Sequence, residues 1–244
     1  MHRFYADEIM PDGTAHLAEE DARHASRVLR LKAGDVFQLL CGGERYEAEL
    51  VELQDTHALC RVGEKLPTTE AKLRITLYHG LPKADKMELI VQKAVELGAA
   101  AVVPVAMSRS VTKLDAKDGI KKRDRWQKIA REASKQSGRC TMMEVASPVS
   151  FKQLTGLLQK HQAAIVPWED ARGYGLQAFH AEHPDITDLA VVIGPEGGIS
   201  EEEIEAMKAA GCRSVTLGPR ILRTETAAIA SIAALMCLYG EMDS

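Results

Sequence analysis

Two glycine-bearing segments carry the residue types that could bind a small ligand and act on it chemically. They are Ile193-Gly194-Pro195-Glu196-Gly197-Gly198-Ile199-Ser200 and Leu217-Gly218-Pro219-Arg220-Ile221-Leu222-Arg223-Thr224-Glu225-Thr226-Ala227. Glycines let a backbone approach a ligand closely, and ligands of open α/β sheets bind beyond the carboxyl ends of strands. Arg223, Glu196 and Glu225 could stabilise charge or move a proton. The two segments also fit an ordinary turn and a helix cap with a surface ion pair.

Other signatures of ligand binding or catalysis are absent from the sequence. No Gly-Lys-Ser/Thr follows the first segment, so it is not a Walker loop, and it lacks the G-x-G-x-x-G spacing of a dinucleotide site. The five cysteines are scattered without a C-x-x-C pair, and the histidines show no metal-binding spacing. The sequence therefore predicts neither a metal site nor disulfides, and free cysteines are typical of a reducing cytoplasm.

A basic stretch suggests a polyanionic partner. Residues 109–139 contain 11 Lys and Arg against 4 Asp and Glu, whereas the chain as a whole has a net charge of −4. Five of these cations recur at helical spacing and would share one helix face: Arg125, Lys128, Arg131, Lys135 and Arg139. Such a row can follow a phosphate backbone, although a solvated helix face has the same pattern. Trp126 on this helix is expected to pack in the core.

The first 65 residues read as a small β domain. Apolar or alternating runs at 36–40, 46–51 and 58–62 predict strands, and residues 19–31 predict a helix that carries His24 among arginines. Short strands joined by tight turns are typical of a small barrel. Residues 66–70 then read as a linker.

From residue 73 strands and helices alternate, which predicts an α/β domain. Strands are expected at 73–78, 101–105, 164–166, 189–193 and 215–217, with helices at 86–97, 124–137, 151–161, 200–210 and 226–239. Ser200 and Glu203 fit a capping box, and Thr224 or Thr226 could cap the last helix. That helix is apolar on nearly every side, so it should be buried in the domain or at a subunit interface. No apolar run approaches the length of a membrane span.

The two glycine-bearing segments resemble the signature loops of the ribosomal RNA small-subunit methyltransferase E family, which belongs to the SPOUT class. The likeness extends to Lys93–Gly98, Pro104 with Arg109-Ser110, Trp126–Gln136, Arg139, Arg3-Phe4, and His24 with Val28–Leu31. It thus covers nearly the whole chain in order. The departures are small: Ile199 stands where a Phe is common, and Met143 lies near where a Pro is expected.

The resemblance implies a fold that pattern arguments alone would not find. It implies a PUA-like RNA-binding β-barrel domain at residues 1–70 and a SPOUT methyltransferase domain at 73–244. The second domain would contain a deep trefoil knot, against the general rule that chains do not knot. The knot loops, at about 166–169, 193–199 and 217–227, would hold S-adenosylmethionine. The enzyme would act as a homodimer, with the helix at 226–239 as a candidate interface.

The resemblance also assigns roles to residues of this chain. We expect donor binding by Pro167, Ile193, Gly194, Glu196, Gly197, Gly198, Leu217, Gly218, Ile221, Leu222, Thr224, Thr226 and Ala227. We expect RNA binding by Arg3, His24, Arg27, Arg30, Arg109, Arg131, Gln136 and Arg139. Arg223 would stabilise the uracil anion or a phosphate, and Glu196 or Glu225 would orient the base or accept its proton. For Glu225 a purely structural bond that holds the loop remains an alternative.

The expected reaction is methylation of N3 of a uridine in 16S ribosomal RNA within the small subunit, in the cytoplasm. N3 of uridine is weakly acidic, and its anion is a competent nucleophile, so the reaction needs no covalent cysteine. One alternative is a SPOUT enzyme with another RNA target or a 2′-hydroxyl target. A second is an RNA-binding assembly factor without catalysis. A nucleotide-binding oxidoreductase fits least, for want of a dinucleotide fingerprint.

Overall fold

The computed structural model describes residues 1–112 and 115–243, which form two compact units. The first unit consists of Met1–Glu70 together with Ser134–Met142, and the second of Ala71–Ala133 and the chain from Met143 onward. Helix α3 (Ala116–Ser137) therefore belongs mainly to the second unit, while its last turn belongs to the first.

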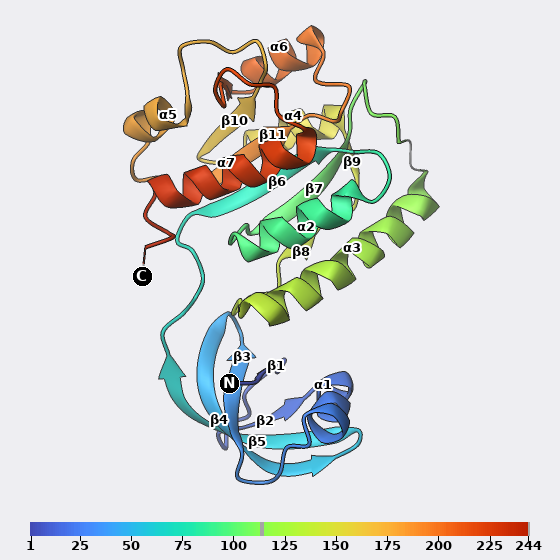
Figure 1. The fold of residues 1–244 in the computed structure, drawn as a ribbon, viewed down its shortest axis with the longest axis vertical. Coiled ribbons are helices and arrows are strands. Elements are labelled where there is room, and N and C mark those ends of the chain that lie inside the picture. Colours follow the sequence, from blue (N-terminus) through green and yellow to red (C-terminus); the bar gives the residue numbers. More distant parts are fainter. Residues whose placement is uncertain (113–114, 244) are drawn as a thin grey trace. The chain divides into compact units, whose positions relative to one another are not determined.

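The first unit is built around a curled five-stranded sheet (Figure 1). Its elements are β1 (Arg3–Tyr5), β2 (Thr14–Leu17), α1 (Glu19–Arg23), η1 (His24–Val28), β3 (Val36–Cys41), β4 (Glu44–Gln54) and β5 (His57–Leu66). The strand order is β1-β3-β4-β5-β2, and the β4–β5 pairing shifts register twice. Such irregularities bend and twist a strand, which explains the curl of the sheet. Phe37, Leu39 and Leu50 fill its inner face.

The helix predicted at 19–31 is shorter and irregular. Residues after Arg23 form a single π-helical turn, η1, and Arg30 then takes a left-handed backbone conformation with φ of 55°. Strands β1 and β2, with three and four residues, were not predicted because they are too short to show an alternating pattern.

Glu70, in the predicted linker, anchors the returning segment of the first unit. Its carboxylate accepts hydrogen bonds from the backbone N–H groups of Cys140 (2.6 Å) and Thr141 (3.0 Å). The Arg139 guanidinium donates to the same carboxylate at 2.6 Å. Burial alone would raise the pKa of Glu70, but Arg139 and Thr141 hold it below its usual range.

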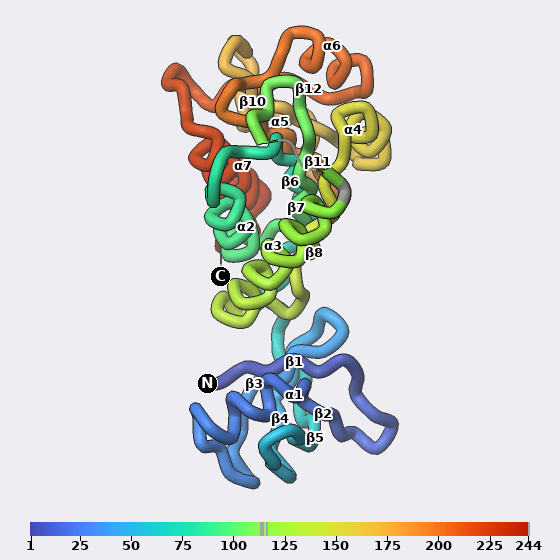
Figure 2. The backbone as a smooth tube through the Cα atoms, turned by 90° about the vertical axis from the view of Figure 1, so that its right-hand side faces the viewer, coloured from blue at the N-terminus to red at the C-terminus, as the bar shows by residue number. Residues whose placement is uncertain are grey.

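The second unit is a three-layer α/β structure around a parallel sheet (Figures 1 and 2). The strands are β6 (Arg74–Gly80), β7 (Ala101–Ala106), β8 (Glu144–Val145), β9 (Val149–Ser150), β10 (Ala163–Pro167), β11 (Asp188–Ile193) and β12 (Cys212–Val215). The helices, besides α3, are α2 (Lys86–Glu96), α4 (Phe151–Leu158), α5 (Leu176–Glu182), α6 (Glu201–Ala209) and α7 (Thr224–Leu238). The strand order is β12-β10-β11-β6-β7-β8, with β9 also paired to β7.

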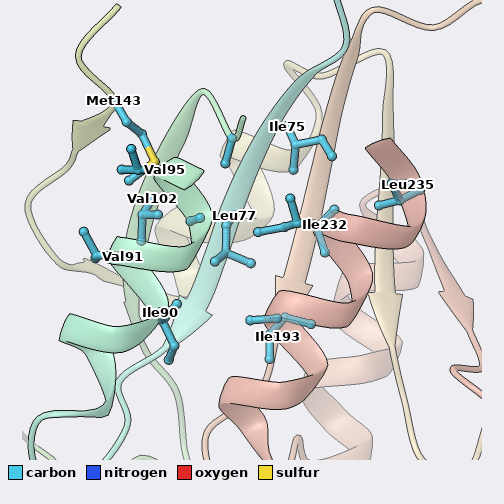
Figure 3. Close-up of a cluster of buried hydrophobic side chains, with 14 of the residues drawn as sticks. Ile75, Leu77, Ile90, Val91, Val95, Val102, Met143, Ile193, Ile232 and Leu235 are labelled. Atoms are coloured by element: carbon cyan, nitrogen blue, oxygen red, sulfur yellow. The ribbon is translucent and has the colours of Figure 1, made fainter. Parts of the chain in front are cut away.

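Each face of this sheet carries its own apolar cluster. On one face, side chains of α2, α3, α5 and α7 pack against residues such as Ile75 and Leu77 of β6, as Figure 3 shows for part of the cluster. On the other face, α4 and α6 pack against Val166 and Val192. Strand β11 is buried from Leu189 to Ile193, as expected for a strand covered on both faces.

The helices predicted in the second unit are present, but some of them begin at other residues than predicted. The capping box at Ser200 and Glu203 begins α6 as predicted. Helix α3 begins eight residues before the predicted position, and α5 was not predicted. The proposed cap of α7 was wrong: Arg223 is the N-cap residue and makes no capping side-chain bond. Helix α7 buries one face within its own unit, and of its other residues Thr226 and Cys237 are exposed. Within the described residues, no helix is long and apolar enough to cross a bilayer.

Candidate functional site

Four neighbouring strands of the second unit, β12, β10, β11 and β6, end at the same edge of the sheet because all four are parallel. A cavity of about 1160 Å³ lies at this edge. Its walls are the segments 167–173, 193–199 and 216–224, with Lys86 and Ala227 completing them. The cavity therefore occupies the place where open α/β sheets bind their ligands.

The loop after β11 is tightly packed against its neighbours. A Cβ atom added to Gly80, the last residue of β6, would lie 2.6 Å from the backbone nitrogen of Pro195. One added to Gly197 would lie 2.8 Å from the carbonyl oxygen of Arg109. Gly198 has φ of 74° and donates its N–H to the Pro195 carbonyl, which closes a turn. Glycine is required here by close approach as well as by conformation.

The segment after β12 is held on both sides. Thr216 donates its N–H to the carbonyl of Tyr174 at 2.8 Å, in the loop that follows β10. Farther along, the Thr224 hydroxyl donates to the Gly194 carbonyl at 2.5 Å. The second glycine-bearing segment thus connects the loop after β10 to the loop after β11, and the two motifs seen in the sequence form adjoining walls.

A buried histidine lies behind this junction. His79 has no exposed surface, and its Nδ1 lies 2.7 Å from the Gly80 carbonyl oxygen, which fixes Nδ1 as the donor. Its Nε2 lies 3.1 Å from the Thr224 hydroxyl, so that hydroxyl is shared between His79 and Gly194. Burial lowers the pKa of His79 to about 4, and the ring is neutral at physiological pH.

The charged groups of the site centre on Lys86. Its Nζ lies 3.2 Å from Oε1 of Glu196 and 3.1 Å from Oε2 of Glu225. The Glu196 carboxylate also accepts the backbone N–H of Lys83 at 3.1 and 3.2 Å. Burial alone would raise the pKa of Glu196, but its own N–H, that of Lys83 and the Lys86 ammonium hold it below its usual range. Hydrogen bonds to Glu225 and Glu196 in turn raise the pKa of Lys86.

Most residues predicted to bind the donor line the cavity. They are Pro167, Ile193, Gly194, Glu196, Gly197, Gly198, Leu217, Gly218, Ile221, Leu222, Thr224 and Ala227. Thr226 is exposed and does not line the cavity. Of the residues predicted to act in catalysis, Arg223 and Glu196 line the cavity, whereas Glu225 does not line it and pairs with Lys86.

Several lining residues were missed by sequence reasoning. Lys86 comes from the start of α2, and Asp170 and Arg172 come from the loop after β10, beyond the predicted loop at about 166–169. The family resemblance predicted a donor-binding loop at about 166–169 but named only Pro167 in it, and the polar residues that follow had no signal except their position after a buried strand. Nothing in the local pattern marked Lys86, because its partners lie more than 100 positions away in the sequence.

The residues predicted to bind RNA have different environments within their units. His24, Arg27 and Arg30 are exposed in the first unit, with Arg27 paired to Asp55. Arg109 and Arg131 are exposed in the second unit.

The helical row of cations is less uniform than its spacing suggests. Arg139 is 6% exposed and bonded to Glu70, which argues against a direct phosphate contact. Lys135 pairs with Asp21 at 2.6 Å. In the first unit Gln136 is exposed and Arg3 is partly buried, with its Nε donating to Gln38. Lys113, part of the basic stretch, lies outside the described residues. Trp126 is buried, as predicted.

Two models of known protein families match this chain. Residues 69–236 match the model of an RNA methyltransferase domain, and residues 17–63 match that of an RNA methyltransferase PUA domain. The chain is therefore an RNA methyltransferase with a PUA domain, and its fold is of the SPOUT type.

Full-length relatives narrow the class to a family. The ribosomal RNA small subunit methyltransferase E of Bacillus subtilis is 37% identical over 96% of both chains. That of Aquifex aeolicus is 32% identical over 97% of this chain and 99% of its own. A crystal structure of the Neisseria gonorrhoeae protein of the same name, bound to S-adenosyl methionine, has a TM-score of 0.85 at 33% identity and covers 98% of each chain. The chain belongs to the ribosomal RNA small subunit methyltransferase E family.

The packing of Gly80 against Pro195 predicts a strong effect of one added methyl group. Gly80→Ala should destabilise the second unit by about 1–3 kcal/mol through overpacking, which lowers its melting temperature by several degrees. Gly156→Ala in α4 is the matched control, because no atom lies within 4 Å of its added Cβ. It should not destabilise the unit, since alanine favours a helix more than glycine does. Thermal unfolding followed by circular dichroism measures both. A Gly80→Ala protein that melts like the wild type would contradict the close approach.

Proposed function

We propose that this protein transfers the methyl group of S-adenosylmethionine to N3 of a uridine in 16S ribosomal RNA within the small subunit. The observation that carries the proposal is the cavity built by both sequence motifs at the carboxyl edge of the sheet, in a chain of the small subunit methyltransferase E family. We expect the protein to act in the cytoplasm, because ribosomes are assembled in that compartment.

The cavity has the features that the methyl donor requires. Glycines at 194, 197 and 198 leave backbone groups close to the cavity, and Ile193, Leu217 and Leu222 offer apolar contacts to an adenine ring. The carboxylates of Glu169, Asp170 and Glu196 suit a ligand with a sulfonium and an ammonium group. When bound, the donor supplies an electrophilic methyl group. We infer that these loops form the predicted trefoil knot, a proposal supported by the hydrogen bonds that hold 216–224 between its neighbours.

We assign the chemistry on the uridine to Arg223 and Glu196. The N3 proton would pass to the Glu196 carboxylate, which is deprotonated because backbone N–H groups and Lys86 stabilise its charge. The developing negative charge of the uracil ring would be stabilised by Arg223, which is exposed at the cavity wall. The N3 lone pair then forms the new bond to the methyl carbon as its bond to sulfur breaks.

Two exposed groups of cations are candidates for holding the RNA backbone. In the first unit these are His24, Arg27 and Arg30, and the left-handed conformation of Arg30 is the kind of backbone strain that concentrates at functional sites. In the second unit they are Arg109 and Arg131. Phosphate contacts of this kind would make binding weaken steeply with salt.

We also propose that the protein is a homodimer through α7. The face of α7 opposite its buried side carries Thr226, Ala230, Ala233 and Cys237, spaced by three or four residues. Small side chains on one helix face allow a second helix to approach closely. This face would be the contact between the two copies.

The proposed function is tested by methyl transfer from labelled S-adenosylmethionine to small subunits and to naked 16S RNA that lack the modification. We expect N3-methyluridine among the product nucleosides, identified by mass spectrometry. Another methylated nucleoside would keep the enzyme class and overturn the target. Donor binding without any transfer to either RNA would contradict the assigned reaction, and absence of donor binding by calorimetry would favour a binding module without catalysis.

Arg223→Ala should lower kcat/KM about 100-fold, which corresponds to about 2.7 kcal/mol of lost transition-state stabilisation. Donor affinity should stay within a few-fold, because the guanidinium acts on the uracil. Arg213→Ala, an exposed arginine on β12 that stacks on Tyr174, is the matched control and should keep full turnover. Full turnover in Arg223→Ala would show that another group stabilises the anion.

Ala230→Arg should convert the dimer to monomers, because a guanidinium would be placed in a close helix contact without a partner. Analytical ultracentrifugation measures the change. Ala209→Arg on the exposed end of α6 introduces the same side chain away from α7 and should leave the dimer intact. A variant at Ala230 that sediments as the wild type would exclude this face as the interface.

A further inference from the structure

Lys86 lies at a position of its helix where a positively charged side chain is unfavourable. It is the first residue of α2, where the partial positive charge of the helix N-terminus opposes a cation. Two residues earlier, Ala84 takes a left-handed conformation with φ of 52°, which costs a non-glycine residue about 1 kcal/mol. The turn nevertheless brings both the Lys83 N–H and the Lys86 ammonium to the Glu196 carboxylate.

The carboxylates of Glu196 and Glu225, which both pair with the Lys86 ammonium, differ in their position relative to the cavity. Glu196 lines the cavity together with Lys86, whereas Glu225 does not line it. The Glu225 side chain is only 15% exposed, and its Oε2, shielded from solvent, lies 3.1 Å from Lys86 Nζ. Lys86 therefore pairs with one carboxylate that lines the cavity and with a second that does not.

We propose that Lys86 is a positioning residue that keeps Glu196 deprotonated and directed at the methyl acceptor, and that Glu225 acts through Lys86 rather than on the RNA. The inference rests on the proposed function, in which Glu196 accepts the N3 proton. It separates the roles of the two glutamates, which the sequence left as alternatives.

The surrounding charges agree with this division. Lys86 favours the ionised form of both carboxyl groups, and Arg223, ahead of α7, adds to the effect on Glu225. His79 of β6 is neutral and contributes no charge. On α2 and the residue before it, Glu88 and Asp85 face Arg125 of α3, so they do not compete for Lys86. Loss of Lys86 would thus leave two carboxylates without their shared cation.

The inference predicts that substitutions at Lys86 and Glu225 affect the acid limb of the pH profile of kcat/KM differently. Removing the cation in Lys86→Met should raise the pKa of Glu196, so that activity falls about tenfold between pH 8 and pH 5.5 while the wild type changes less than threefold. Glu225→Gln removes the second carboxylate that pairs with Lys86. The acid limb should then move to lower pH or stay unchanged, because Lys86 pairs with Glu196 alone. Lys86→Arg should restore the wild-type profile.

The measurement uses the full-length protein, S-adenosylmethionine and unmodified small subunits, with donor affinity determined separately by calorimetry. Lys93→Met is the matched control: it removes an ion pair, with Glu96, from the same helix away from the cavity and should keep the wild-type profile.

Each outcome has a distinct meaning. Failure of the wild type to form N3-methyluridine would overturn the proposed function. A wild type that forms it, with a Lys86→Met protein that loses activity equally at every pH, would overturn the inference and leave Lys86 a structural role. If Lys86→Met does not fold by circular dichroism, Glu225→Gln decides: an upward shift of its acid limb contradicts the inference.

Discussion

The hydrogen bond from the Thr224 hydroxyl to the Gly194 carbonyl is the contact on which the site depends. It joins the loop after β11 to the start of α7, and the segments 193–199 and 216–224 form most of the cavity wall. The bond is partly buried, and the fully buried His79 lies on its other side, so loss of the Thr224 hydroxyl would leave the His79 ring without its Nε2 partner. The bond thus connects the loop after β11 to the first residue of α7, and it complements the contacts that each segment makes with its other neighbours.

The parts of this site that could be read from sequence are those set by local chemistry. Gly194, Gly197 and Gly198 follow a strand whose apolar run marks it as buried, and a capping box fixes where the next helix begins. Local pattern was therefore enough to predict the α/β class and both glycine-bearing walls. The short strands β1 and β2 were not predictable, because they depend on pairing partners rather than on their own residues.

Contacts between residues that are distant in the sequence could not be predicted from the sequence. Lys86 meets Glu196 because β6 and β11 are adjacent in the sheet, and strand order is not written in the spacing of either residue. The helical spacing of Arg131, Lys135 and Arg139 showed correctly that they recur along one helix. It could not show that the last two face carboxylates of the first unit while Arg131 stays exposed.

The first unit is not continuous in sequence, and this has a consequence for how it can form during synthesis. The Glu70 carboxylate takes its partners from residues 139–141, about 70 positions later in the chain. A nascent chain that has emerged only to residue 70 contains all five strands of the sheet but exposes an unpaired Glu70. The unit can be completed only after β6, β7 and α3 of the second unit have left the ribosome, while β8 to β12 are still to be made, so the first unit matures during synthesis of the second.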